Sequence, residues 1–261
     1  MSKKRPLKIE APEVLYHQPV QDNTGYTKIV HRTENQAKAI RSIIKNAISI
    51  LIGPPGSGKT ALAVGTAVHL LRKNDPSISK IIISRPAIPV FEQIGFMPGN
   101  KDEKMIPYIL PMKKEFEKFL PRGEFDKLLR DNVIEIVPLA YIQGWNIEDA
   151  ILLVDEAALM NFNQFGLVLS RLCEDGKIVL MGDPVQDGGS GTGHALERIA
   201  TLLDGLDDIG VVRFIAADNQ RHKLVNKIQK ILLGADSRAP LTLEDRFKDD
   251  YWGQEYKLYG K

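Results

Sequence analysis

The sequence predicts an α/β domain built on a mostly parallel sheet, because short apolar runs alternate with segments of helical apolar spacing. A second observation is the glycine-rich loop GPPGSGKT at 53–60, which stands between one such run and one such helical segment. The predicted strands are AISILI at 47–52, KIIIS at 80–84, VIEIVP at 133–138, AILLVDE at 150–156, KIVLMGD at 177–183 and GVVRFI at 210–215. Strands joined through helices in this way pair in parallel.

Composition along the chain predicts three parts. Residues 1–32 form a basic arm, because they combine lysine, arginine and proline without an amphipathic period. Residues 33–234 form one α/β domain, since a chain of 261 residues with 43% hydrophobic composition can bury a large core. Residues 235–261 form a charged tail with clustered aromatic side chains.

Composition also excludes several classes of protein. The net charge is only +2, so nucleic-acid binding would need a local basic patch rather than an overall basic field. The single cysteine, Cys173, cannot form an internal disulfide, and the five histidines lack metal-ligand spacing. The basic N-terminus is not followed by an apolar region, and nowhere do about 18 apolar residues run together. We therefore expect a cytoplasmic protein that neither spans a membrane nor is secreted.

The loop at 53–60 matches the phosphate-binding pattern G-x-x-x-x-G-K-[ST], with Lys59 and Thr60 at its end, and is called the P-loop below. Its glycines let successive backbone N–H groups point at one anion, and the following helix N-terminus adds partial positive charge. Lys59 is expected to neutralise β- and γ-phosphate oxygens, and the Thr60 hydroxyl to bind Mg²⁺. The predicted nucleotide-binding residues here are Gly53, Pro54, Pro55, Gly56, Ser57, Gly58, Lys59, Thr60 and Ala61.

Two acids at the end of a later strand indicate hydrolysis. Asp155 can reach Mg²⁺ through a water, and Glu156 can orient and deprotonate an attacking water. The alternative is a pair of solvated acids at a strand end. Gln186, in GDPVQ after the next strand, is expected to contact the γ-phosphate or the water, although Gly-Asp-Pro is also good turn chemistry. Together these residues favour a hydrolase over a P-loop kinase.

Gln36 has two interpretations that its spacing leaves open. With Thr33 it makes a T-x-x-Q capping box at the start of a predicted helix. Alternatively, its amide donor and acceptor bind the edge of the adenine base.

The order of these motifs resembles that of superfamily 1 helicases: Gln36, then GPPGSGKT, SRPAI at 84–88, VDEA at 154–157 and GDPVQ at 182–186. More closely, three further motifs look like those of the phosphate-starvation-inducible PhoH-like proteins. They are GFMPG at 95–99, NVIEIVPLAYIQG at 132–144 and QRHKLV at 220–225. The similarity covers about residues 33–233.

This resemblance implies a P-loop NTPase with a single RecA-like domain, ATP and Mg²⁺ as cofactors, a hexameric ring and ATP-dependent activity on RNA. The chain is similar in length to phage-encoded members, which would work in the host cytoplasm, and no appended nuclease-like or RNA-binding domain is expected. Two positions depart from the family. Ala158 stands where members usually carry glutamine, and LAYIQGWNIEDA at 139–150 is less basic than usual. Both departures bear on strand unwinding rather than on hydrolysis.

Contacts to nucleic acid are expected mostly from the resemblance. They are assigned to Arg85 at the end of a strand, with Tyr141 and Trp145 as stacking platforms. The alternative for Arg85 is a surface or interface residue, and the two aromatic residues would then belong to the core.

An arginine that completes the site is expected from a neighbouring subunit, because too few residues follow Leu233 to build a second RecA-like domain. A head-to-tail ring can place an arginine of one subunit against the γ-phosphate of the next. The candidate is Arg221, which matches the family's arginine-histidine motif, and Arg171 is second. A surface charge is the alternative.

The sequence therefore predicts a Mg²⁺-dependent ATPase that converts hydrolysis into movement on single-stranded RNA or DNA. A rival hypothesis is an oligomeric scaffold that binds ATP to assemble and hydrolyses it slowly, without translocation. Stimulation of hydrolysis by single strands would separate the two.

Overall fold

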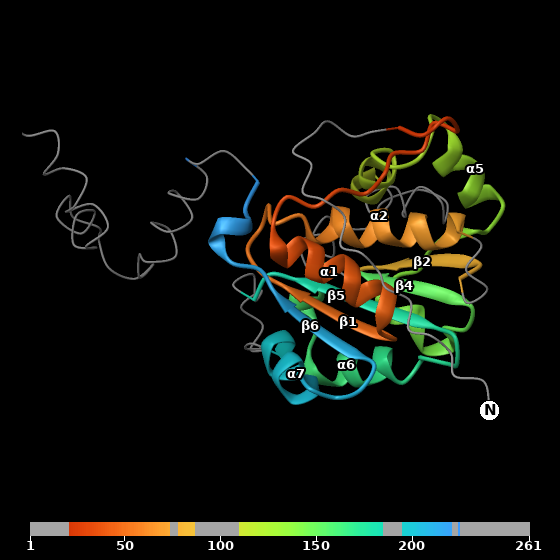
Figure 1. The fold of residues 1–261 in the computed structure, drawn as a ribbon. Helices are drawn as coiled ribbons and strands as arrows, with labels where there is room; N and C mark the ends of the chain where they lie inside the picture. The colour runs from red at the N-terminus through yellow and green to blue at the C-terminus, as the bar shows by residue number, and fades with distance from the viewer. Residues whose placement is uncertain (1–20, 74–77, 87–109, 185–194, 221–223, 225–261) are drawn as a thin grey trace, which may run out of the picture. The chain divides into compact units, whose positions relative to one another are not determined.

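The computed structural model describes residues 21–73, 78–86, 110–184, 195–220 and 224, and the chain divides into two compact units, residues 1–218 and 219–261. Within these residues the first unit contains a six-stranded parallel sheet of order β3-β2-β4-β5-β1-β6 (Figure 1). The strands are β1 (Ile48–Ile52), β2 (Lys80–Ser84), β3 (Ile134–Ile136), β4 (Ala150–Val154), β5 (Lys177–Gly182) and β6 (Ile209–Arg213). The predicted parallel α/β sheet and all six predicted strands are confirmed.

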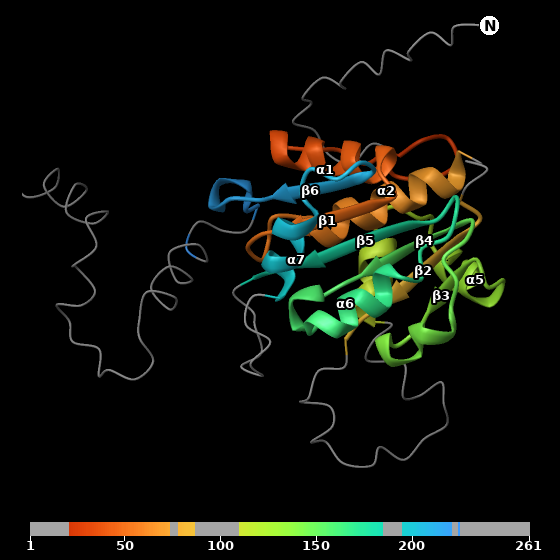
Figure 2. The same ribbon diagram turned by 90° about the horizontal axis from the view of Figure 1, so that it is seen from below.

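Helices cover both faces of the sheet. Figures 1 and 2 show α1 (Glu34–Lys45) and α2 (Lys59–Arg72) on one face, and α6 (Phe162–Leu169) and α7 (Ala195–Leu203) on the other. A further α-helix, α5 (Glu124–Arg130), precedes β3, and residues 110–116 are also helical. Three 3₁₀ helices are η1 (Leu139–Gly144), η2 (Ala157–Leu159) and η3 (Ala216–Asp218). No helix in the described part of the chain is both long and apolar enough to cross a bilayer.

The burial of the central strands explains why their sequences are nearly continuous apolar runs. Strands β1 and β4 are buried along their whole length, because helices cover both of their faces. Alternate residues then enter two separate cores. In β1, Leu51 packs with α1 and α2, whereas Ile50 packs with the core that contains α6 and α7.

The strand order sets the spacing of the functional motifs. β5 lies between β1 and β4, so the P-loop after β1 and the acids after β4 begin two strands apart. At the usual spacing of neighbouring strands this separation is about 10 Å. The N-terminus of α2 spans this separation, because the Thr60 hydroxyl at the end of the P-loop lies 3.2 Å from Asp155 Oδ1.

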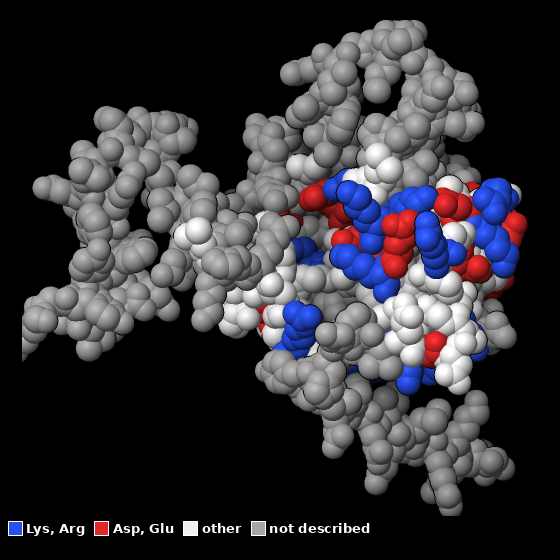
Figure 3. All heavy atoms as spheres, turned by 90° about the horizontal axis from the view of Figure 1, so that it is seen from above, with Lys and Arg blue, Asp and Glu red and all other residues white. Residues whose placement is uncertain are grey.

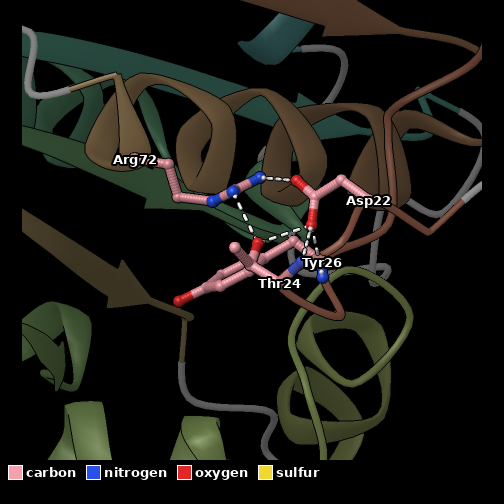
Figure 4. Close-up of polar contacts among 4 residues, drawn as sticks. All are labelled: Asp22, Thr24, Tyr26 and Arg72. Atoms are coloured by element: carbon pink, nitrogen blue, oxygen red, sulfur yellow. Dashed lines mark hydrogen bonds and ion pairs between the residues drawn. The ribbon is translucent and has the colours of Figure 1, made fainter.

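Residues 21–32, which belong to the predicted N-terminal arm, pack on α2. Tyr26 and Ile29 contact the core, and the backbone N–H of Thr27 donates to the Phe119 carbonyl at 3.0 Å. Arg72 of α2 lies 3.8 Å from the centre of the Tyr26 ring (Figure 4). Only a few isolated residues carry this docking, so the sequence shows no amphipathic period to reveal it.

The Asp22 carboxylate stabilises a turn in the same segment. Asp22 accepts hydrogen bonds from Thr24 and from the Tyr26 backbone N–H, and pairs with Arg72 Nη1 at 2.8 Å (Figure 4). The hydrogen bond from the Thr24 hydroxyl, with smaller contributions from the backbone donors and Arg72, lowers the pKa of Asp22 to about 2.

The predicted C-terminal boundary at residue 234 stays a prediction, because residues 225–234 lie outside the part of the chain that the structure describes. The predicted tail, residues 235–261, lies outside the described residues.

Candidate active site

The P-loop joins β1 to α2 and has the backbone that its glycines predict. Gly58 is the N-cap of α2 with φ of 89°, a left-handed conformation that suits glycine. Gly53 is needed for a different reason. A Cβ at this position would lie 2.5 Å from Cβ of Phe214, which follows β6. The loop can therefore enter its turn only because position 53 has no side chain.

The ammonium group of Lys59 lies inside this loop. Its Nζ donates to the carbonyl of Gly53 at 2.7 Å and to that of Pro54 at 3.0 Å. Ser57 closes the turn, with its fully buried hydroxyl donating to the Pro54 carbonyl at 2.9 Å. The lysine is thus already placed where its charge would meet phosphate oxygens bound by the loop.

Two side chains with oxygen ligands meet where the P-loop helix approaches the end of β4. The Thr60 hydroxyl donates to Asp155 Oδ1 at 3.2 Å, although the two residues are 95 positions apart. A hydroxyl and a carboxylate are the oxygen ligands that Mg²⁺ prefers. No group of three or more His, Cys, Asp or Glu side chains suited to a metal occurs among the described residues. The pair therefore fits a Mg²⁺ ion that takes its remaining ligands from nucleotide phosphates and water.

Glu156 follows Asp155 in an unusual backbone conformation. Its φ of 54° is left-handed, which costs about 1–2 kcal/mol for a residue other than glycine. The chain then turns at once into η2, so Glu156 leaves the strand direction and its carboxylate stands at the carboxyl edge of the sheet. Strain of this kind is common where a side chain must be aimed for function.

Arg85 lies beside the two acids, a position that the sequence motifs did not predict. Its Nη2 lies 3.2 Å from Glu156 Oε1 and its Nε lies 3.5 Å from Asp155 Oδ2. The guanidinium therefore pairs with both acids. The predicted contact of Arg85 with nucleic acid stays a prediction. The available signal was the position of Arg85 after β2, the strand that pairs with β4.

Gln36 connects α1 to the P-loop. Its Nε2 donates to the Ser57 carbonyl at 3.1 Å, and its Oε1 accepts from the Arg32 backbone N–H at 2.6 Å. Thr33 accepts from the Gln36 backbone N–H, which is one half of the predicted capping box. The other half differs, because the glutamine side chain reaches residue 32 instead of the N-cap. Both ends of the amide bind backbone here, and adenine contact stays a prediction.

The carboxyl end of β5 lies between the two halves of the site. The Gly53 backbone N–H donates to the Gly182 carbonyl at 3.2 Å, which fixes the P-loop against β5. A Cβ on Gly182 would lie 2.7 Å from the backbone nitrogen of Ala158. Asp183 follows and is buried, with only 5% of its surface exposed. The motif GDPVQ could have indicated Asp183 as a site residue, whereas Gln186 lies outside the described residues.

The predicted stacking residues lie on and beside η1. Tyr141 is 68% exposed, while Trp145 is half-buried and packs against the core beneath η1. Arg171 donates to the Gln143 carbonyl of η1 at 3.1 Å. Arg221, the candidate for action between subunits, lies outside the described residues.

Charge is mixed on the face that carries α5 and the segment before it. Figure 3 shows acidic and basic side chains interleaved over this region. Ion pairs such as Lys113–Asp126, Lys118–Glu115 and Lys127–Glu124 account for the mixing. This face is therefore a poor candidate for a phosphate backbone, which requires a surface of one sign.

Comparison with known proteins identifies the family. The model of the family described as PhoH-like protein matches residues 28–232. The chain is 35% identical over 229 residues to the PhoH-like protein of Bacillus subtilis, covering 87% of this chain and 70% of the relative. It is 36% identical over 198 residues to that of Mycobacterium tuberculosis, covering 76% of this chain and 56% of the relative.

A solved structure with a similar fold is the large terminase of a thermophilic bacteriophage, at 14% identity and a TM-score of 0.47. That match covers 77% of this chain and 50% of the terminase. The chain spans little more than half the length of the mycobacterial relative. Since the family model matches most of the chain, with the P-loop and both site acids inside the matched range, the chain belongs to the PhoH-like family.

Proposed function

We propose that this protein hydrolyses ATP and couples hydrolysis to movement along single-stranded RNA or DNA. One observation carries the ATPase assignment. The P-loop lysine, the Thr60–Asp155 pair and Glu156 all lie at the carboxyl edge of one parallel sheet. Ligands of open α/β sheets bind at this edge. The predicted single RecA-like domain and P-loop NTPase class agree with this arrangement.

The chain's own residues suffice for the binding step. P-loop N–H groups and the N-terminus of α2 would receive the phosphates, with Lys59 supplying a fixed positive charge. Thr60 and Asp155 would hold Mg²⁺, which supplies charge stabilisation to the phosphates when bound. Gln36 supports the loop from behind through the Ser57 carbonyl.

Glu156 is the group available for the hydrolytic step. It would take a proton from a water whose oxygen attacks the γ-phosphorus. The bond between that phosphorus and the bridging oxygen then breaks, and ADP leaves with the electron pair. Asp155 is less suited to this step, because Thr60 already engages its Oδ1 in the metal site.

The nucleic-acid partner is proposed from the family and from η1. The exposed Tyr141 ring can stack a base, and Trp145 caps the end of the same 3₁₀ helix. ATP hydrolysis should be measured with and without single-stranded RNA and DNA, over a series of salt concentrations. A motor is expected to hydrolyse faster with strand, and its strand affinity should fall steeply as salt rises. Slow hydrolysis that strands do not change would favour the rival oligomeric scaffold.

We also propose a homo-oligomeric ring, with six subunits as the family resemblance implies. Arg221 would act across the interface on the neighbouring subunit's γ-phosphate, with Arg171 as second candidate. The hydrogen bond from Arg171 to η1 supports a structural role for that residue, so Arg221 is preferred.

Because the reaction draws on ATP and the single cysteine needs no oxidising compartment, we place the activity in the cytoplasm.

A further inference from the structure

Arg85 makes contacts that ATP binding and hydrolysis do not require. Its guanidinium binds Glu156 Oε1 at 3.2 Å and approaches Asp155 Oδ2 at 3.5 Å. The side chains of Arg85, Asp155 and Glu156 are 18%, 13% and 30% exposed, respectively. Because the group is largely shielded from water, salt and solvent weaken these ion pairs less than they weaken a pair on the surface.

The sheet order shows which way Arg85 draws the glutamate. β4, which leads into Glu156, lies between β2 and β5, and the P-loop follows β1 on the far side of β5 (Figure 2). Arg85 follows β2, so the ion pair ties the Glu156 carboxylate to a residue from the strand on the side of β4 away from β1. A general base must instead face a water at the γ-phosphate. The ion pair therefore competes with the catalytic orientation of Glu156.

The backbone of Arg85 also connects the acids to η1. Its carbonyl accepts a hydrogen bond from the Leu139 backbone N–H at 3.3 Å, and Leu139 begins η1. Two residues later, η1 presents the exposed Tyr141 ring. A strand that stacks a base on this ring would bring phosphodiester groups to the end of β2. A phosphodiester is a strong partner for a guanidinium, which can donate to two of its oxygens.

We propose that Arg85 is a positioning residue that restrains Glu156 until a phosphodiester group of a bound single strand takes over its guanidinium. Glu156 then turns toward the P-loop, so strand binding raises the rate of hydrolysis. The inference rests on the proposed function and adds a contact through which strand binding regulates hydrolysis. It predicts that strand and Glu156 compete for one guanidinium.

Competition of this kind is reciprocal, so strand affinity tests it without any hydrolysis. Fluorescence anisotropy of a labelled single-stranded RNA, measured without nucleotide, gives the affinity. Glu156→Gln removes the competing charge and should tighten binding about fivefold or more. In an Arg85→Gln background the same change should have no effect, because the guanidinium is gone. This double-mutant cycle isolates the coupling between the two residues.

A matched control uses another arginine–glutamate pair. Arg41 Nη2 lies 2.6 Å from Glu34 Oε1 on the exposed face of α1. Glu34→Gln removes the same charge outside the site, so it measures the general gain in strand affinity from losing one acid. The gain in RNA affinity from Glu156→Gln must exceed the gain from Glu34→Gln. Equal gains would overturn the proposal that Arg85 restrains Glu156.

Kinetics give a second readout. Arg85→Gln should raise kcat of unstimulated ATP hydrolysis about fivefold, leave KM for ATP unchanged and abolish stimulation by RNA. A fall in unstimulated kcat would overturn the inference, because Arg85 would then assist catalysis. If the parent is stimulated by RNA but Glu156→Gln binds RNA no more tightly, the restraint fails and the proposed function stands. If the parent neither hydrolyses ATP nor responds to strands, the proposed function fails and the inference fails with it.

Discussion

Two neighbouring carboxylates at the end of β4 have different surroundings, and this difference separates their roles. Asp155 is tied to Thr60 of the P-loop helix, whereas the described contact of Glu156 is with Arg85. β4 ends at Val154, and the left-handed backbone at Glu156 turns the chain away from the strand direction one residue after Asp155. Arg85 contacts both acids, so the hydrogen bond with Thr60 is what distinguishes the proposed metal ligand, Asp155, from the proposed general base, Glu156.

Glu156→Gln tests this division of roles. The amide keeps the shape of the side chain, so ATP binding should be retained, but it cannot take a proton from water. We expect kcat to fall by about 100-fold or more while the affinity for a fluorescent ATP analogue stays near that of the parent. Lys59→Ala is the contrasting variant and should lose nucleotide affinity, because it removes the fixed charge of the P-loop. Turnover of Glu156→Gln at the parent rate would contradict the general-base role.

The P-loop, as an element, depends on the strands beside it. Gly53 lies against Phe214 after β6, so Gly53→Ala forces a side chain into occupied space. Overpacking of this kind costs about 1–3 kcal/mol in the free energy of unfolding, which urea denaturation would measure. Gly166→Ala in α6 is the control, since a Cβ there meets nothing within 4 Å. A loss of stability equal in both variants would show that the Phe214 contact is unimportant.

The segment at residues 21–32 is a second element whose docking can be tested. Asp22 has its pKa lowered to about 2, so the stability it contributes is present above the ordinary carboxyl pKa of 3.8. That contribution is lost as the pH falls from 3.8 toward 2. Asp22→Asn should remove this part of the pH dependence of the free energy of unfolding. It should also speed hydrogen exchange of the Tyr26 and Thr27 amides at neutral pH. Exchange at the parent rate would show that Tyr26 and Ile29 hold the segment unaided.

For the molecule as a whole, the proposed ring predicts that a second subunit completes the site. Lys59→Ala and Arg221→Ala proteins should each be nearly inactive as ATPases. A mixture that exchanges subunits should recover part of the activity, at interfaces that pair an intact P-loop with an intact arginine. Full activity of Arg221→Ala alone would remove this residue from the mechanism. Full activity of a strictly monomeric preparation would contradict the shared site.

Local sequence patterns were sufficient to predict the strands, the P-loop and the two acids. The four central strands were predictable because each is buried along most of its length and is therefore mostly apolar. The P-loop and the Asp155–Glu156 pair were predictable because phosphate and metal chemistry restrict the residue types at fixed spacing.

The way in which these parts meet depends on contacts between residues that are far apart in the sequence. Arg85 and Glu156 are 71 positions apart, and parallel pairing of β2 with β4 brings them together. No local pattern could reveal that pairing, because the strand order of a sheet is set by long-range packing. The docking of Tyr26 on Arg72 and the tie between Gln36 and Ser57 have the same origin. The residues proposed to perform the chemistry can thus be recognised from local motifs. The ion pair between Arg85 and Glu156, in contrast, forms only because β2 and β4 lie side by side.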